Sequence, residues 1–488
     1  MTEPVVAVGL HPLQFGLGED VNPVYLGLFV VYLLAILAIG LWGYLRTEDI
    51  DDFWVFGKEL GPVLATWSLV ATFVSSVSVI GFIGAVYADG YAIMTGIIFG
   101  LMLGVSAFYF ATPYVRELDL VTFPDIMAEV TGIQATRPVA GGILLLEAWL
   151  YIIMQLLGAA LLVTAITGVP FEYMVWVIGA VFIAYTALGG LVSVAWTDLA
   201  QGVLMVATVF VAFFYMIYDL GSLTAINEQF AAIDPAFVDP TGDGAFTLTF
   251  LLATQLAFFG TIFTVQSIII RVNATTDVRT AKLHVAWGGV ILSVFYAALI
   301  MLGGATTVAL EDAGLAADPV DMAFPLLITE YLPTAVGSVI IVAVMSAILS
   351  TTDQSLHAAG ITTANDIYDY FADDASQERL FGVSRIATVV AGITAILATV
   401  DPPGTIIYIY EFRAVLLTAA LFIPVYAGLW KRELFTGRAL ATSMLLGGIG
   451  SVAWQLLDDP LGIPAVFAGG GLAVAALIVV TIIERNTD

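Results

Sequence analysis

Cysteine is absent from the sequence and charged residues are scarce. Without cysteine the chain has no disulfides, thiolate metal sites or iron–sulfur clusters. Only 11% of its 488 residues are charged, whereas soluble proteins carry about a quarter. The three histidines are scattered without metal-ligand spacing, and we interpret them as structural. These absences exclude a soluble globular protein, and no metal or nucleophile constellation supports an enzyme.

Basic residues are the rarest charged class. Lys and Arg total 14 and Asp and Glu total 40, which gives a formal net charge of −26. No basic patch exists to neutralise phosphates, so nucleic acid is excluded as a partner. The acidic residues crowd the hydrophilic loops, which favours an organism with high-salt fluids; the alternative is that some loops bind cations weakly.

Long apolar runs, by contrast, recur along the whole chain. Hydrophobic residues make up 60% of it and the mean hydropathy is +1.01. A barrel is disfavoured because its strands would alternate in polarity over short segments. We predict an all-α polytopic membrane protein with about 13 transmembrane helices, because each run of about 20 apolar residues can span a bilayer. The predicted spans are 24–45, 62–86, 92–112, 137–168, 171–190, 196–219, 247–271, 282–309, 334–360, 380–400, 404–430, 437–457 and 463–483.

The distribution of positive charge predicts the orientation. With the N-terminus outside and the spans alternating, every Lys and Arg except Arg413 falls on the inner side or at its boundary. The positive-inside rule therefore predicts a multi-pass protein of the cell membrane with an extracellular N-terminus and a cytoplasmic C-terminus. The first twenty residues lack a basic and an apolar region, so they do not form a cleavable signal peptide.

Two predicted spans carry clusters of small hydroxyl residues. In 62–86 the hydroxyls and glycines indicate either close helix packing or a broken helix whose free carbonyls bind an ion. In 334–360, Ala347, Ser350 and Thr351 share one helix face through i, i+3 and i+4 spacing. Their oxygens suit a monovalent cation, although hydroxyls bonded to the preceding turn are an alternative explanation.

Two further clusters contain charged residues. Asp198, at the start of the sixth span beside an inside turn, either caps a helix or faces an inward cavity and helps to draw out a cation. Glu411 and Arg413 lie in one span, where charge is costly unless it is paired or functional. They do not share a helix face, so each needs another partner. For Arg413 the candidates are Glu147 of the fourth span and a substrate carboxylate.

Taken together, these stretches resemble the sodium/solute symporter family, which includes the sodium/proline, sodium/pantothenate and sodium/sugar cotransporters. Six motifs occur in the family's order and cover nearly the whole chain. They are ATFVSSVSVIGFIGAVYADG (71–90), TFPDIMAEVTG (122–132), TALGGLVSVAWTDLAQG (186–202), IIIRVNATTDVRTAK (268–282), AILSTTDQSLHAAGITTANDIY (347–368) and GLWKRELFTGRAL (428–440).

The resemblance implies a LeuT-type core of two inverted repeats with five helices each, and sodium-coupled symport of a small organic solute by alternating access. A membrane sensor module with the same fold is the alternative function. The first helix of each repeat is expected to break, near Ser75–Ser78 and near Phe258–Thr261. The implied segments are an extracellular N-terminal segment (1–23), an extra helix (24–45), the two repeats (62–219 and 247–430) and two C-terminal helices (437–483).

Residue by residue, the resemblance implies a sodium site between two of these helices. The implied ligands are the carbonyls of Ala71, Val74 and Ala347 and the hydroxyls of Ser350 and Thr351. Asp198 matches the acidic residue near the inward sodium exit. Sodium is thus the expected coupling ion.

The substrate site is less constrained by the resemblance. Val77 and Ser78 stand where sugar cotransporters have Glu and Gln, so sugar is disfavoured. Arg413 has no counterpart in the family pattern, and a substrate with a carboxylate would explain it. The expected solute is a carboxylate, an amino acid or a vitamin. The expected substrate-binding residues are Ser75, Val77, Ser78, Phe259, Gly260, Tyr410, Glu411 and Arg413.

Overall fold

The computed structural model describes residues 23–44, 60–118, 120, 122–372, 375–431 and 433–487, and these ranges fold into helices joined by short connections. Within them the only β-bridge pairs Leu60 with Thr275. The helices of the first half are α1 (Pro23–Tyr44), α3 (Pro62–Phe73), η2 (Val77–Gly81), α4 (Phe82–Asp89), α5 (Tyr91–Leu118), α6 (Phe123–Thr131), α7 (Thr136–Thr167), α8 (Phe171–Leu220), α9 (Leu223–Ile233) and η3 (Pro235–Val238).

The second half continues the helical pattern. Its helices are α10 (Leu248–Ile262), α11 (Gln266–Asn273), α12 (Val278–Asp312), η4 (Val320–Met322), α13 (Ala323–Leu326), η5 (Leu327–Tyr331), α14 (Thr334–Ile361), η6 (Thr362–Tyr368), α15 (Asp369–Ala372), α16 (Gln377–Val400), α17 (Ile406–Leu417), η7 (Thr418–Phe422), α18 (Ile423–Trp430), α19 (Gly437–Leu456), η8 (Pro460–Gly462) and α20 (Ala465–Thr487).

The helices confirm an all-α polytopic membrane protein. Ten helices of the described ranges are long and apolar enough to cross a membrane, or eleven if the bent pair Pro62–Phe73 and Val77–Asp89 is one span. Two shorter apolar stretches, Pro23–Ala35 within α1 and Phe171–Ala187 within α8, are further candidates for membrane spans. The total of about thirteen spans stays a prediction, as do the domain boundaries.

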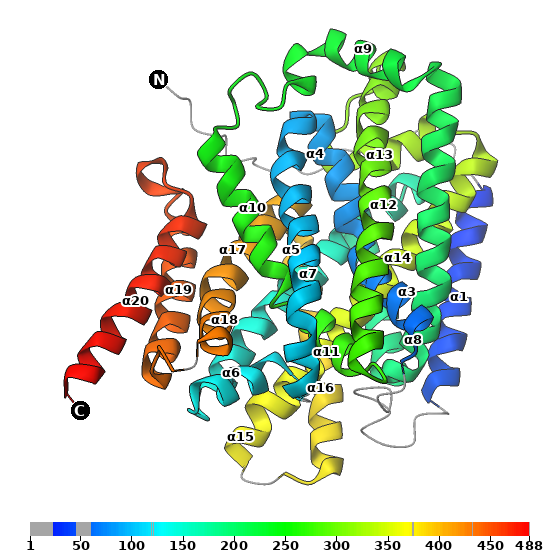
Figure 1. The fold of residues 1–488 in the computed structure, drawn as a ribbon. Coiled ribbons are helices and arrows are strands. Elements are labelled where there is room, and N and C mark those ends of the chain that lie inside the picture. The colour runs from blue at the N-terminus through cyan, green and yellow to red at the C-terminus, as the bar shows by residue number, and fades with distance from the viewer. Residues whose placement is uncertain are drawn as a thin grey trace.

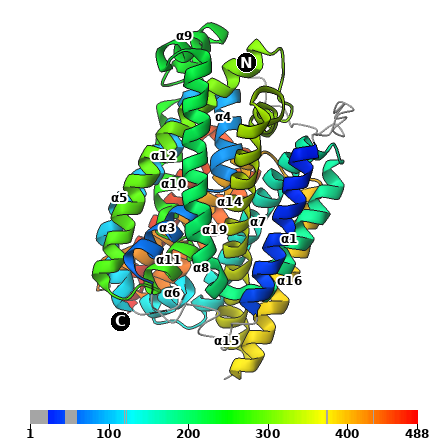
Figure 2. The same cartoon turned by 90° about the vertical axis from the view of Figure 1, so that its right-hand side faces the viewer.

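α7 forms the centre of the bundle. In its most apolar window 94% of the residues are buried, against 39% for α19 and α20. α7 packs against α14, α8, α16, α17 and α6. Figure 1 shows α19 and α20 side by side at one edge of the molecule and α1 at the opposite edge. In Figure 2, which looks onto that opposite edge, α1 lies in front. A polar residue on α7 therefore faces protein instead of lipid.

The first helix break lies where the sequence predicts it. α3 ends at Phe73, the backbone of Val74 is extended (φ −92°, ψ 103°), and η2 begins at Val77. The two helices meet at 49°. We call residues 74–76 the break segment. It lies deep in the protein, since Val74, Ser75 and Ser76 are all buried.

The second break lies a few residues beyond its predicted position, which corrects the prediction at Phe258–Thr261. α10 continues to Ile262, and α11 begins at Gln266 after an extended Val265. Gly260, which suggested the earlier position, is helical. A Cβ there would come 2.4 Å from Thr418 Oγ1. This glycine therefore permits close packing of α10 against η7 and does not break the helix.

Candidate functional site

Four oxygen atoms from two helices meet at the first break. Thr351 Oγ1 of α14 lies 3.4 Å from the carbonyl oxygen of Ala71 and 3.4 Å from that of Val74. It lies 3.0 Å from the carbonyl oxygen of Ala347, one turn earlier in its own helix. The carbonyls of α3 are free to face α14 because the helix stops there and the following turn no longer uses them.

Ser350 lies beside this cluster. It is 1% exposed, and its Oγ accepts a hydrogen bond from Gln354 Nε2 at 3.3 Å. The structure thus brings together Ala71, Val74, Ala347 and Thr351, with Ser350 adjacent on α14. Carbonyl and hydroxyl oxygens without a carboxylate form a ligand set suited to a hard ion of single charge.

Asp198 belongs to α8, but its side chain lies outside the described residues. Its expected position at an inward exit therefore stays a prediction. Thr186, earlier in α8, donates a hydrogen bond to Asp353 of α14, which follows Thr351 by two positions. α8 and α14 are thus joined by buried polar atoms.

A narrow cavity, here called the central cavity, adjoins the oxygen cluster. Its volume is about 30 Å³, so in this conformation it is too small for an organic solute. Its polar lining comes from α3, α7, α10, α11, α14 and α17. These polar residues are Thr72, Glu147, Tyr151, Thr261, Gln266, Ser267, Thr351, Gln354, Ser355, Tyr410 and Arg413.

Arg413 and Glu147 form a buried ion pair on the wall of the central cavity. Arg413 Nη2 and Nε lie 2.6 and 2.7 Å from Glu147 Oε1. The guanidinium also lies 4.5 Å from the ring centre of Tyr151 and 5.5 Å from that of Tyr410. Arg413 is 3% exposed and Glu147 is 5% exposed, so water screens the pair little. Two helices far apart in the sequence, α7 and α17, are thereby held together.

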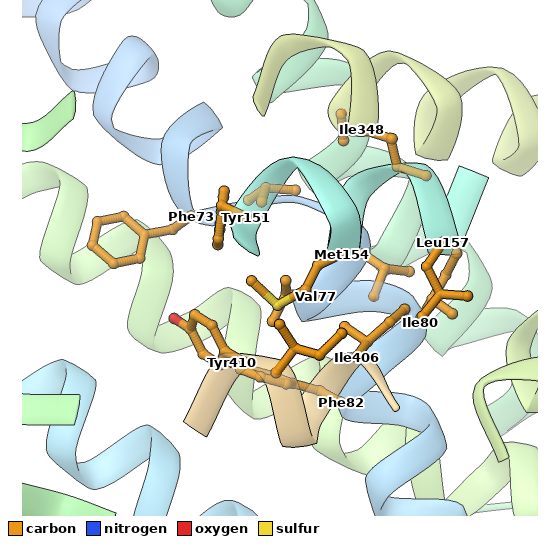
Figure 3. Close-up of a cluster of buried hydrophobic side chains, with 14 of the residues drawn as sticks. Phe73, Val77, Ile80, Phe82, Tyr151, Met154, Leu157, Ile348, Ile406 and Tyr410 are labelled. Atoms are coloured by element: carbon orange, nitrogen blue, oxygen red, sulfur yellow. The ribbon is translucent and has the colours of Figure 1, made fainter. Parts of the chain in front are cut away.

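The hydroxyls of Ser75 and Ser78, at the first break, interact with other protein groups. Ser78 Oγ accepts a hydrogen bond from Ser75 N at 2.8 Å and donates to Ser75 O at 3.0 Å. Ser75 Oγ lies 3.5 Å from Tyr151 OH. Val77 lies in a buried apolar cluster between α7 and α17. Figure 3 shows this cluster, which includes Phe73, Val77, Tyr151, Met154 and Tyr410.

Of the eight expected substrate residues, Tyr410 and Arg413 line the central cavity and six do not. These six are Ser75, Val77 and Ser78 at the first break, and Phe259, Gly260 and Glu411. The ring of Phe259 is tilted against that of Phe263 and meets that of Phe422 edge to face, with ring centres 5.1 and 5.6 Å apart. Gly260 packs against Thr418, as described above. Glu411 lines a separate cavity bounded by α10, α19 and α20, because it projects from another face of α17 than Arg413.

Sequence reasoning missed two polar residues of α7. Tyr151 and Gln155 follow Glu147 at i+4 and i+8 and therefore lie on the same side of α7. Gln155 Oε1 accepts a hydrogen bond from Ser76 N at 3.1 Å and lies 2.9 Å from Ser76 Oγ. The signal was available, since an amide within an apolar span requires a hydrogen-bonding partner.

A helical membrane bundle with a broken helix at its centre and a polar cavity beside the break defines a secondary transporter with the LeuT-type fold. The model of the sodium:solute symporter family matches residues 53–447, so the chain belongs to this family. It is a transporter family and not a family of enzymes.

Relatives of the chain are transporters of different solutes. It is 27% identical over 431 residues to the high-affinity proline transporter PutP of Bacillus subtilis, covering 86% of this chain and 89% of that protein. It is 23% identical to the sodium/pantothenate symporter of Escherichia coli, covering 86% and 88%. It is 24% identical to the sodium/sialic acid symporter NanT of Aliivibrio fischeri, covering 88% and 86%.

Solved structures share the fold. A substrate-bound, outward-open Na⁺-coupled sialic acid symporter superposes with a TM-score of 0.79 at 20% identity, covering 95% of this chain and 98% of that one. The transporter Mhp1 in a closed conformation gives a TM-score of 0.53 at 13% identity, covering 88% and 94%.

Proposed function

We propose that the protein carries a small organic solute across the cell membrane together with sodium, by alternating access. The observation that carries the proposal is the position of Thr351 Oγ1, within 3.4 Å of carbonyl oxygens on both sides of the α3–α14 contact. Sodium would be held by the carbonyls of Ala71, Val74 and Ala347 and the hydroxyls of Ser350 and Thr351. Asp198 would then assist sodium release to the inside.

The arrangement couples the ion to a conformation. Sodium between α3 and α14 would hold the broken helix against α14, because both helices supply its ligands. The solute would bind in the central cavity, which shares Thr72, Phe73 and Thr351 with the region of the break. Each ligand then favours the same state and tightens the binding of the other.

The proposed solute carries a carboxylate. Arg413 lies on the wall of the central cavity beside the rings of Tyr151 and Tyr410, and its guanidinium is a planar group with several donors. Glu147 neutralises Arg413 before the solute arrives, so a carboxylate would compete with Glu147 for it. The relatives named for proline, pantothenate and sialic acid all transport compounds with a carboxyl group.

We also propose an orientation of the protein in the membrane. The N-terminus lies outside and the C-terminus in the cytoplasm, because this orientation places the Lys and Arg residues inside. The acidic composition suits a high-salt medium, in which a sodium gradient is available to drive uptake.

The test uses proteoliposomes with an imposed inward sodium gradient, screened over amino acids, monocarboxylates and vitamins. We expect one class of solute to enter only with sodium. The double variant Ser350→Ala/Thr351→Ala should lose sodium-dependent uptake, because it removes both proposed hydroxyl ligands. The matched control is Thr352→Ala, whose hydroxyl donates to the carbonyl oxygen of Ile348 in its own helix.

Sodium-independent uptake in the wild type would contradict the proposed coupling. Unchanged sodium dependence in the double variant would contradict the proposed ligands while leaving symport intact.

A further inference from the structure

Ser76, in the middle of the break segment, is held against α7. Its backbone N–H donates to Gln155 Oε1 at 3.1 Å. Its Oγ lies 2.9 Å from Gln155 Oε1 and 3.0 Å from the carbonyl oxygen of Met154. Figure 3 shows Met154 of α7 facing Val77, the residue that follows Ser76. The break segment therefore lies directly on the α7 backbone.

A glycine makes this contact possible. A Cβ at Gly158 would lie 2.5 Å from the Cβ of Ser76, so any side chain at position 158 would push the break segment away. Gly158 and Gln155 are one turn apart on α7 and share a face. Together they form a socket for Ser76, hereafter the Ser76 socket.

Gln155 replaces a helix cap that the break segment lacks. The N–H groups of the residues that lead into η2 have no acceptors in the preceding turn, because α3 has already ended. Ser75 N is satisfied by Ser78 Oγ, and Ser76 N is satisfied from outside by Gln155. Gln155 is fully buried, so no water can replace it if it is lost.

The Ser76 socket is connected to the proposed ion ligands through two residues of backbone. Val74, whose carbonyl oxygen lies 3.4 Å from Thr351 Oγ1, precedes Ser76 by two positions. Fixing the N–H of Ser76 limits the backbone rotations that set the direction of the Val74 carbonyl. One side of the break segment thus faces α14 while the other is held by α7.

We propose that Gln155 is a positioning residue for sodium binding: with Gly158, it holds Ser76 so that the Val74 carbonyl is aimed at Thr351 before the ion arrives. This inference rests on the proposed sodium site. It predicts that loss of the socket weakens sodium binding without removing it, since the ion's own ligands remain.

The first test substitutes Gln155→Leu, which keeps the size of the side chain and removes its acceptor. In the purified full-length protein we measure the sodium concentration that half-saturates the thermal stabilisation by NaCl, with ²²Na⁺ binding as a second readout. We expect it to rise by about tenfold, since an unsatisfied buried donor must be compensated when the ion-competent arrangement forms.

One further variant tests whether sodium binding is restored, and another serves as a control. Gln155→Glu keeps an acceptor for Ser76 N and should restore half-saturation to near the wild-type value. Thr164→Val is the matched control, because Thr164 lies on the same helix, is fully buried, and its hydroxyl has no partner among the described residues. It should leave sodium binding unchanged.

A second test changes the other half of the socket, and it does not depend on the folding of the Leu variant. Gly158→Ala should also weaken sodium binding, because its Cβ displaces Ser76. The double variant Ser76→Gly/Gly158→Ala removes the opposing Cβ and should recover part of the loss.

The outcomes separate this inference from the proposed site. If wild-type protein binds sodium but Gln155→Leu and Gly158→Ala bind it equally well, the positioning role is wrong and the site stands. If Thr351→Ala binds sodium as the wild type does, the proposed site is wrong, and the positioning role is wrong with it.

Discussion

At the scale of single residues, the buried ion pair of Arg413 and Glu147 joins two helices and supplies the proposed specificity for a carboxylate. Removing one partner of a buried pair leaves an uncompensated charge and costs about 3–5 kcal/mol of stability, whereas replacing both is often nearly neutral. A single substitution would therefore confuse a folding defect with a binding defect. Substituting both partners separates the two.

We predict that Arg413→Met lowers the melting temperature, and that Glu147→Gln/Arg413→Met recovers most of it, because the double variant buries no lone charge. The double variant should nevertheless transport the solute no better than its carboxamide analogue, since the carboxylate anchor is gone. Melting temperature and competition uptake measure the two effects. If the double variant still discriminates in favour of the carboxylate, Arg413 is not the anchor.

At the scale of elements, an acidic side chain joins the connection between α12 and α14 to the start of α17. Asp321 of η4 is 2% exposed, and its Oδ2 accepts a hydrogen bond from Ile406 N at 3.0 Å. It thereby satisfies a free N–H in the first turn of α17. Burial raises the pKa of Asp321 from 3.8 to about 7, and the bond from Ile406 N opposes this rise.

The pH dependence follows from the direction of this shift. The pKa in the folded state lies above the ordinary value, so the folded protein binds more protons between about pH 4 and pH 7. Its stability should fall as the pH rises through this window and stay low above it. Asp321→Asn keeps an acceptor without a charge, so it should raise the melting temperature at pH 8 and have little effect at pH 4.

The control for this prediction is Asp312→Asn, a substitution of an exposed carboxylate at the end of α12. It should change the melting temperature little at either pH. A melting-temperature difference between Asp321→Asn and the wild type that does not depend on pH would contradict the prediction.

At the scale of the whole molecule, the net charge of −26 is the dominant electrostatic feature. The acidic residues repel one another in the compact state. Salt shortens the screening length from about 10 Å at 0.1 M to about 3 Å at 1 M. Two effects of salt on stability are then expected: a general one from screening, and a specific one from sodium at the proposed site.

We predict that the melting temperature rises with KCl as well as with NaCl, and that NaCl adds a further increase that saturates at low concentration. Thermal unfolding in parallel KCl and NaCl titrations measures both. Ser350→Ala/Thr351→Ala should lose only the additional increase given by NaCl. If KCl destabilises the protein, self-repulsion does not limit its stability.

The sequence by itself determined the class of protein and most of its helices, because apolar runs that match the bilayer are a local property. The predicted span 282–309, for example, corresponds to α12 (Val278–Asp312). The hydroxyls at the first break fitted either close helix packing or a broken helix, and the family resemblance favoured the break. The second was misplaced at Gly260, because a glycine that serves close packing and one that breaks a helix look alike in sequence.

Only the tertiary structure decided which polar residues meet. It placed Thr351 beside the free carbonyls of α3, gave Arg413 the partner Glu147 from a helix 266 residues away in sequence, and directed Glu411 into a different cavity. It also revealed Gln155 as the acceptor for Ser76. Such pairings depend on how helices pack and rotate against one another, and spacing along one helix does not encode them.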